Sequence, residues 1–153
     1  MKRIGLIGGT GLLGFTKDSK LILPWTLENS LELEIDTPFG KVPLTVFNLS
    51  FNDKKCKIFF LQRHHNDGSG VKPPHHINHL ANIFAMDSCE LDFTISVCSV
   101  GAINEKFIPG MVGIANQYID FSGIPISYNE SDAEFTSMTS PFDQELNKDL
   151  LTS

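Results

Sequence analysis

The sequence lacks the features that mark several specialised classes of protein. Its three cysteines are odd in number and widely spaced, and its 153 residues contain no Cys-x-x-Cys pair. Such cysteines are typical of reduced thiols in a cytoplasmic protein and argue against a disulfide scaffold. No segment approaches the roughly 18 continuous apolar residues of a membrane span, so we expect a cytoplasmic protein with no membrane partner.

The sequence also lacks a positive net charge. It has 12 basic and 18 acidic residues, which gives a formal charge of −6. A field of this sign repels polyanions, so we expect no nucleic-acid partner. A small anion is not excluded, because a few convergent donors outweigh a weak overall field at short range.

The composition is typical of one domain spanning residues 1–153, with 41% apolar residues. Short apolar or alternating runs predict strands at residues 4–7, 31–35, 42–49, 56–61 and 93–97. Turn residues at 36–40 and 52–53 indicate that the second, third and fourth of these strands form an antiparallel meander.

Two helices are predicted. The first runs from His75 to about Asp87 and has an apolar stripe, formed by Ile77, Leu80, Ala81 and Phe84. The second begins at Ser140, which we expect to be its N-cap. Residues 12–24 allow only a short helix, since Pro24 ends it, and residues 122–139 are predicted to be an exposed loop.

A glycine-rich loop, Gly9 to Gly14, follows the first strand and matches Gly-x-Gly-x-x-Gly. One interpretation is dinucleotide binding, with Asp36 as the ribose-binding acid. Dinucleotide-binding domains have a long crossover helix after this loop, and Pro24 leaves room here only for a short one. The second interpretation is a tight turn that needs glycine for positive φ. The third is a loop whose backbone N–H groups hold a phosphate, with the hydroxyl of Thr10.

Two further segments lie at predicted strand ends. Arg63-His64-His65 follows the strand at 56–61, and Cys98-Ser99-Val100-Gly101 follows the strand at 93–97. An arginine at a strand exit presents a planar fork to a phosphate or carboxylate, although a solvated loop arginine remains the alternative. Ligands of open α/β sheets gather at such ends.

The chain has no Gly-x-Ser-x-Gly elbow and no P-loop lysine. It therefore points towards anion binding without a covalent nucleophile.

All five histidines fall within sixteen residues, at positions 64, 65, 75, 76 and 79. His75 and His79 are four apart and would share a helix face, which makes them a possible metal pair. No acidic residue is placed to complete that site. Surface positions and helix capping are the simpler explanation, and we expect no metal.

Several short motifs occur in an order that resembles one enzyme family. They are Ile4-Gly5-Leu6-Ile7-Gly8-Gly9-Thr10-Gly11-Leu12, Asp36-Thr37-Pro38-Phe39-Gly40, Arg63-His64, Pro73-Pro74-His75, Ile77-Asn78, Ala81-Asn82-Ile83, Ser99-Val100-Gly101, Pro109-Gly110, Gln117-Tyr118-Ile119-Asp120 and Ser140-Pro141-Phe142. The family is that of the trimeric purine nucleoside phosphorylases, in its methylthioadenosine and methylthioinosine phosphorylase branch.

The resemblance implies an α/β, three-layer fold with a central mixed sheet. It implies a pentosyltransferase that cleaves 5′-methylthioadenosine, 5′-methylthioinosine, or inosine or guanosine with inorganic phosphate as co-substrate. The products are a free purine and a sugar 1-phosphate. No cofactor is implied, and the assembly is a homotrimer. The family's phosphate contacts fall on Thr10, Arg63, His64, Cys98 and Ser99.

This chain also departs from the family pattern. His65 stands where glycine is usual, and Cys98 stands where threonine, serine or asparagine is usual. The resemblance covers about the first three fifths of a usual member, and the base-recognition half has no counterpart here. We therefore expect the C-terminal part of the fold to be missing and the chain alone to have little or no phosphorolytic activity. The alternatives are a non-catalytic relic, a subunit of a split enzyme, and a dinucleotide-binding domain.

Overall fold

The computed structural model describes residues 1–12, 24–65, 71–122 and 137–152. It divides into two compact units, Met1–Val100 and Gly101–Ser153, which are described separately below. The expected short helix at 12–24 and most of the expected loop at 122–139 lie outside the described residues. The single-domain expectation stays a prediction.

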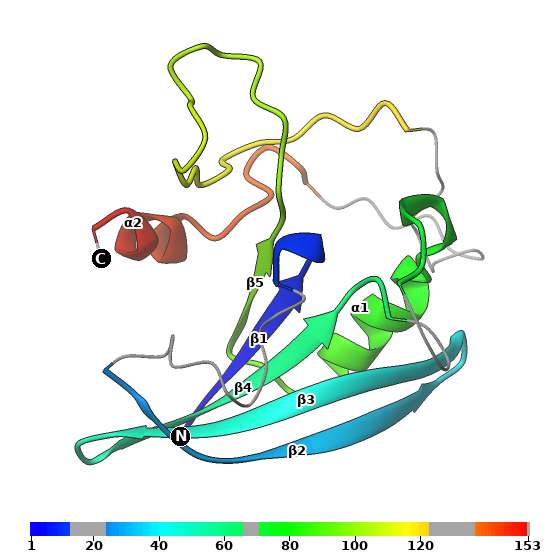
Figure 1. The fold of residues 1–153 in the computed structure, drawn as a ribbon, viewed down its shortest axis with the longest axis vertical. Helices are drawn as coiled ribbons and strands as arrows, with labels where there is room; N and C mark the ends of the chain where they lie inside the picture. Colours follow the sequence, from blue (N-terminus) through cyan, green and yellow to red (C-terminus); the bar gives the residue numbers. More distant parts are fainter. Residues whose placement is uncertain (13–23, 66–70, 123–136, 153) are drawn as a thin grey trace. The chain divides into compact units, whose positions relative to one another are not determined.

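The first unit is built on a five-stranded mixed sheet in the order β2-β3-β4-β1-β5 (Figure 1). The strands are β1 (Lys2–Gly8), β2 (Thr26–Thr37), β3 (Gly40–Phe51), β4 (Lys54–Gln62) and β5 (Phe93–Val97). All five predicted strands are present, and an α/β fold with a central mixed sheet is confirmed.

The predicted antiparallel meander is also confirmed. β2 pairs with β3, and β3 pairs with β4, both antiparallel. The turn between β3 and β4 places Asn52 at φ 52°, a left-handed conformation that asparagine tolerates. The turn between β2 and β3 has Gly40 at φ 128°. Beyond the meander the sheet becomes parallel, because β1 pairs in parallel with both β4 and β5.

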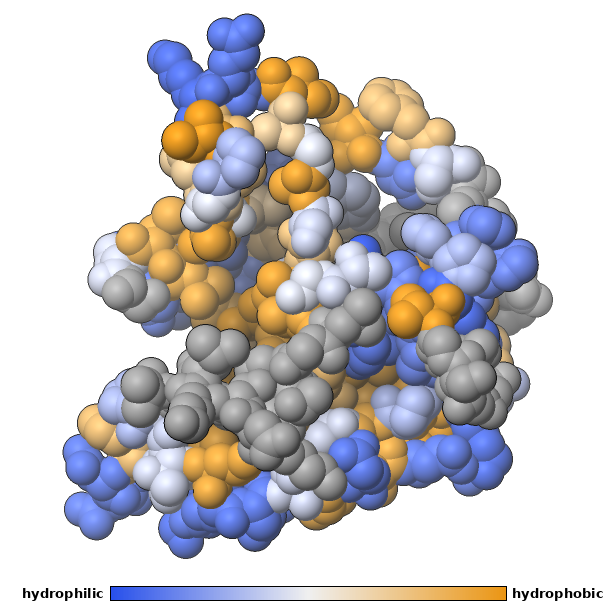
Figure 2. Space-filling model, viewed as in Figure 1, coloured by the Kyte–Doolittle hydropathy of each residue, from blue (hydrophilic) through white to orange (hydrophobic). Residues whose placement is uncertain are grey.

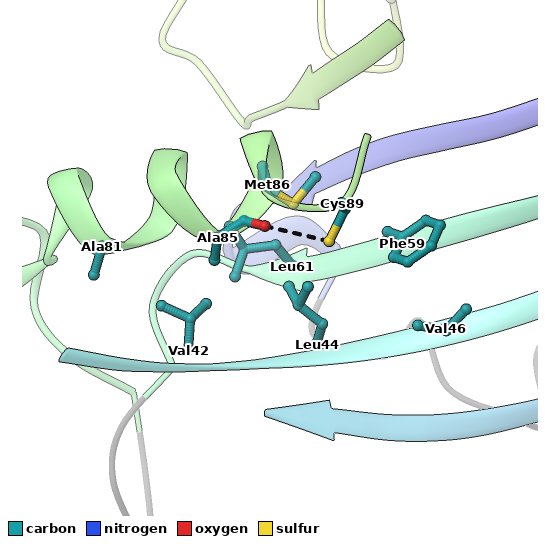
Figure 3. Close-up of a cluster of buried hydrophobic side chains, with 9 residues drawn as sticks. All are labelled: Val42, Leu44, Val46, Phe59, Leu61, Ala81, Ala85, Met86 and Cys89. Carbon is teal, nitrogen blue, oxygen red and sulfur yellow. Dashed lines mark hydrogen bonds between the residues drawn. The ribbon is translucent and has the colours of Figure 1, made fainter. Parts of the chain in front are cut away.

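One face of the sheet packs against helix α1 (His79–Asp87), and the side chains of this interface form a buried core (Figure 3). Its members are Val42, Leu44, Val46, Phe59, Leu61, Ala81, Ala85, Met86 and Cys89. Burying an aliphatic side chain of this size contributes roughly 1.5–3 kcal/mol. Cys89 donates its thiol to the carbonyl of Ala85 at 3.2 Å, and burial raises the pKa of that thiol.

The apolar stripe of α1 differs from the prediction. The buried residues of the helix are Ala81, Asn82, Ala85 and Met86. The two alanines allow the helix to approach the sheet closely, which leaves the bulkier Leu80 and Phe84 at the rim. Phe84 lies edge-on to Phe39 of the β2–β3 turn, with ring centroids 6.1 Å apart.

The start of α1 also differs from the prediction. A short 3-10 turn, η2 (Pro74–His76), is followed by Ile77 in an extended conformation, and α1 begins only at His79. The cause is Asn78, whose Oδ1 accepts from the N–H of Ala81 at 3.1 Å and so caps the helix. Its Nδ2 donates to the carbonyl of Phe39 at 2.7 Å, so the same amide joins the helix to the β2–β3 turn.

Arg3 of β1 contacts both the segment that follows α1 and the neighbouring strand β4. Its Nη2 donates to the carbonyl of Cys89 at 2.6 Å, and its guanidinium carbon lies 4.8 Å from the centroid of the Phe59 ring. Its backbone N–H donates to the carboxylate of Asp92 at 2.7 Å, and this bond, with the charge of Lys2, lowers the pKa of Asp92. These contacts fix the start of β5 beside β1.

The second unit has one described helix, α2 (Gln144–Thr152). Its cap is not Ser140 as predicted but Asp143, whose Oδ1 accepts from the N–H of Leu146 at 2.8 Å. Asp143 thus supplies the acceptor for the first turn, and the helix begins three residues later than predicted. The described part of residues 101–122 contains no helix or strand, and many of its apolar side chains are exposed (Figure 2). No described helix is long and apolar enough to cross a membrane.

We predict that Asn78→Ala lowers the free energy of unfolding by about 1–2 kcal/mol, because the helix loses its cap and its bond to the β2–β3 turn. Chemical denaturation followed by circular dichroism measures this change. His79→Ala is the matched control, since His79 is an exposed residue of the same helical turn, and its effect should stay within about 0.5 kcal/mol. Equal stabilities of the two variants would contradict the role of Asn78.

Candidate functional site

The three segments that the sequence marks as a site follow three neighbouring parallel strands. Gly8 at the end of β1 is in register with Gln62 at the end of β4 and with Val97 at the end of β5. The chain therefore leaves all three strands at the same level, on one edge of the sheet (Figure 1). Parallel strands lie about 4.8 Å apart, so the segments after β4 and β5 flank the glycine loop at close range.

The glycine loop is held at this edge by backbone hydrogen bonds. The N–H of Gly9 donates to the carbonyl of Val97 at 3.0 Å, which continues the pairing of β1 with β5. A single 3-10 turn, η1 (Thr10–Leu12), follows, in which the N–H of Leu12 donates back to the carbonyl of Gly9 at 3.0 Å. The first N–H groups of such a turn have no partner within it, and Thr10 and Gly11 are exposed.

Close approach explains why glycine suits positions 9 and 11 of this loop, while Gly14 lies outside the described residues. A Cβ built on Gly9 would lie 3.3 Å from Nη2 of Arg63, and a Cβ built on Gly11 would lie 2.9 Å from Oγ of Ser99. The only described glycines with positive φ are Gly40 and Gly110, so the interpretation that these positions need positive φ is wrong. The loop passes between a guanidinium and a hydroxyl, both of which can donate to an anion.

Arg63 is held from two sides in a half-buried position. Its backbone N–H donates to the carbonyl of Gly8 at 3.0 Å, which extends the pairing of β1 with β4 beyond the last strand residue. Its Nε donates to Nε2 of His64 at 3.3 Å. It is therefore not a free solvated arginine. Its terminal nitrogen Nη2 lies beside Gly9 of the glycine loop.

His64 is buried, at 3% exposure, and both of its ring nitrogens have partners. Nδ1 lies 2.9 Å from the carbonyl of Lys72, and Nε2 accepts from Arg63. A carbonyl only accepts, so the proton of the neutral ring is on Nδ1. A direct bond from this ring to a phosphate requires one of the two contacts to break. In this structure the ring instead orients Arg63.

Two residues of the site were missed by the sequence reasoning. Gln62 donates from Nε2 to the carbonyl of Gly9 at 3.3 Å and accepts from the N–H of His64 at 3.4 Å, so it bridges the ends of β1 and β4. Asn82 of α1 donates from Nδ2 to the carbonyl of Arg63 at 3.2 Å. The sequence feature that could have identified Asn82 is its position, because it is a polar residue directly after Ala81 of the predicted apolar stripe.

The remaining predicted residues lie at the same edge. Ser99 faces Gly11, as described above. Cys98 is an exposed, free thiol directly after β5, and Thr10 opens the 3-10 turn. The structure thus brings Thr10, Arg63 and Ser99 around one loop. His64 lies behind Arg63.

The dinucleotide interpretation of the loop fails on the position of Asp36. That residue lies in β2, which is separated from β1 by β3 and β4. It is exposed and lies 3.6 Å from the ammonium group of Lys41. Strands about 4.8 Å apart put it roughly 14 Å to the side of β1, where it cannot bind a ribose held at the glycine loop.

The possible metal pair is also not formed. His75 belongs to the turn η2 and His79 to α1, so the two do not share a helix face. The described residues contain no group of three or more metal-binding side chains. His75, His76 and His79 are exposed, as expected for surface histidines, whereas His64 is buried.

Comparison with known proteins relates the chain to one group of enzymes, although no family model matches it. It is 31% identical to an S-methyl-5′-thioadenosine phosphorylase from Hyperthermus butylicus, over 98% of this chain and 51% of that protein. It is 35% identical to a probable 6-oxopurine nucleoside phosphorylase from Archaeoglobus fulgidus, over 97% and 54%. It is 32% identical to a probable S-methyl-5′-thioinosine phosphorylase from Methanocaldococcus jannaschii, over 94% and 50%.

Solved structures show the same fold. A methylthioadenosine phosphorylase from Schistosoma mansoni without ligand aligns with a TM-score of 0.61 at 22% identity, over 99% of this chain and 52% of that chain. The same enzyme in complex with tubercidin aligns with a TM-score of 0.61. The resemblance found in the motifs is confirmed. The chain spans about half the length of the curated relatives it matches.

We predict that Gly11→Ala displaces the side chain of Ser99, because the new Cβ would lie 2.9 Å from its hydroxyl oxygen. Backbone amide NMR of the variant should show shifts at residues 97–100 as well as around the substitution. Gly101→Ala is the matched control, since a Cβ there meets nothing within 4 Å. Unchanged resonances at 97–100 in Gly11→Ala would show that the loop and Ser99 are not in contact.

Proposed function

We propose that this chain forms the phosphate-binding part of a purine nucleoside phosphorylase. One observation carries the proposal: β1, β4 and β5 end in register, and each is followed by a segment with a donor that the sequence marks as a phosphate contact. The donors are the glycine loop with Thr10, the guanidinium of Arg63 and the hydroxyl of Ser99. The similarity to phosphorylases over about half their length supports the same assignment.

The proposed site suits an anion although the chain has a net charge of −6. Unpaired N–H groups at the start of a helical turn, a guanidinium fork and a hydroxyl all donate, and charge-assisted bonds to a phosphate are the strongest of their kind. Gln62 and His64 lie behind these donors and hold them in place. Cys98 contributes through its backbone or its exposed thiol.

In the proposed reaction the phosphate itself is the nucleophile. A phosphate oxygen forms a bond to the anomeric carbon while the bond from that carbon to the purine nitrogen breaks, and the purine leaves with the electron pair and takes up a proton. The protein's part is to hold the phosphate in line with the breaking bond and to stabilise the cationic sugar through that dianion. No enzyme nucleophile and no cofactor are needed.

The proposed substrate class is a purine nucleoside, since the relatives are named for methylthioadenosine, methylthioinosine and 6-oxopurine nucleosides. No described residue is assigned to reading the base. We therefore expect the chain alone to bind phosphate but to release little or no free purine.

Assembly as a homotrimer and a cytoplasmic location also stay predictions. The three free cysteines support the latter.

We predict that the chain binds inorganic phosphate, measured by titration calorimetry, and that Arg63→Ala weakens this binding by at least about tenfold. The reason is the loss of charge-assisted hydrogen bonds worth roughly 1.5–3 kcal/mol each. Arg63→Lys should recover only part of the affinity, because an ammonium group cannot form the bidentate fork. In any complete form of the enzyme, Arg63→Ala should abolish phosphate-dependent release of free base.

Lys54→Ala is the matched charge control. Lys54 begins the strand that Arg63 follows, so it lies at the opposite end of β4, and the variant should bind phosphate as the wild type does. Equal affinities of the wild type and Arg63→Ala would remove Arg63 from the site. A folded chain that binds no phosphate would instead favour a non-catalytic relic. Robust turnover of methylthioadenosine or inosine by the purified chain would contradict its assignment as a binding part only.

A further inference from the structure

A buried asparagine lies directly behind the arginine of the proposed phosphate site. Asn82 belongs to α1 and is 3% exposed. Its Nδ2 donates to the backbone carbonyl of Arg63 at 3.2 Å, and its Oδ1 lies 2.8 Å from Nε2 of His65. The other buried residues of the helix, Ala81, Ala85 and Met86, are all apolar. The amide is therefore explained by its two polar contacts.

The two contacts fix the orientation of both side chains. The carbonyl of Arg63 only accepts, so the amide nitrogen of Asn82 faces it, and the amide oxygen faces His65. That oxygen also only accepts, so Nε2 of His65 carries a proton. Nδ1 of His65 is buried and has no partner among the described residues. His64 has the opposite arrangement, with its proton on Nδ1.

Arg63 is consequently held at three points. Its backbone N–H donates to Gly8, its backbone carbonyl accepts from Asn82, and its Nε donates to His64. Among the described residues the two terminal nitrogens of the planar guanidinium have no hydrogen-bond partner, and Nη2 lies on the side of Gly9. Ordering a long arginine side chain normally opposes binding. Here the backbone contacts fix the point from which that side chain starts, and the contact of Nε with His64 restrains its end before a ligand arrives.

We propose that Asn82, oriented by His65, is a positioning residue that directs the guanidinium of Arg63 towards the glycine loop. Through it, helix α1 supports the ligand edge of the sheet without touching the ligand. This proposal rests on the proposed function only in naming phosphate as the ligand. The hydrogen-bond relay from His65 through Asn82 to Arg63 is a property of the protein alone.

The test uses the full chain with two substitutions of the asparagine. Asn82→Leu removes both contacts at similar volume. Asn82→Asp keeps an acceptor for His65 but turns a carboxylate oxygen towards the carbonyl of Arg63. Both should raise the dissociation constant of inorganic phosphate, measured by calorimetry, by about three- to tenfold, which corresponds to one net hydrogen bond. Both should also shift the Arg63 Nε–H resonance in ¹⁵N-correlated NMR spectra recorded without phosphate.

Asn78→Ala is the matched control, because it removes an asparagine of structural role just before the same helix. It should lower the melting temperature while leaving the phosphate dissociation constant within about twofold and the Arg63 Nε–H resonance in place. His65 provides a second route if a change inside the core prevents folding. His65→Leu should weaken phosphate binding, and His65→Gln, which keeps a side-chain N–H donor, should restore it.

The outcomes separate this proposal from the proposed function. If Asn82→Leu and His65→Leu lower the melting temperature but change neither the dissociation constant nor the Arg63 resonance, Asn82 has only a structural role and the proposal is wrong. If the wild type binds no phosphate, the proposed function fails, and the resonance decides alone. A shift in Asn82→Leu that is absent in Asn78→Ala supports the relay, and no shift overturns it.

Discussion

The parallel pairing of β1 with β4 and β5 is the constraint on which the rest of the structure depends. Because the three strands are in register at Gly8, Gln62 and Val97, their following segments emerge at one level and meet. A slip of one residue in either pairing would turn the side chains of that strand to the opposite face and move its donor away from the glycine loop. The contacts of Arg3 with Cys89 and Asp92 fix one of these pairings from the other end of β1.

Side-chain amides connect the elements around this edge where backbone pairing ends. Gln62 joins the ends of β1 and β4, Asn78 joins α1 to the β2–β3 turn, and Asn82 joins α1 to Arg63. An amide suits this position because it donates and accepts at once without carrying charge, so it can be half-buried or buried without the cost of desolvating an ion. Around the charged group, Arg63, the amide and backbone partners carry no charge, which suits the proposed role of its guanidinium in binding an anion. An acidic net charge is therefore compatible with the proposed anion site.

Local sequence patterns were sufficient for the five strands and the antiparallel meander, but not for the parallel pairing of β1 with β4 and β5 or for the helix boundaries. The five strands and the meander follow from alternation and turn residues such as Asn52, whose preferences act over a few positions. The start of α1 depends on the hydrogen bond of Asn78 with Phe39, a residue 39 positions away, and the periodicity of the sequence does not contain that information.

The site likewise divides into residues that local patterns predict and contacts that depend on packing. Thr10, Arg63 and Ser99 were predicted as site residues because they follow predicted strands and match motifs of the family. The contacts of Asn82 and the burial of His64 depend on how α1 and the segment at Lys72 pack, which only the structure shows.

The absence of a nucleophile motif fits the architecture of the site. A reaction in which the co-substrate attacks requires only donors and rigid support from the protein at that end of the substrate, and these are what the edge of β1, β4 and β5 provides. Binding of the nucleophile and recognition of the leaving group are then physically separable tasks, since they act on opposite sides of the anomeric carbon. Phosphate affinity can therefore reside in a chain that spans about half the length of its relatives. Turnover in the proposed reaction requires more, because stabilising the transition state requires the phosphate and the leaving purine to be held in line at the same time.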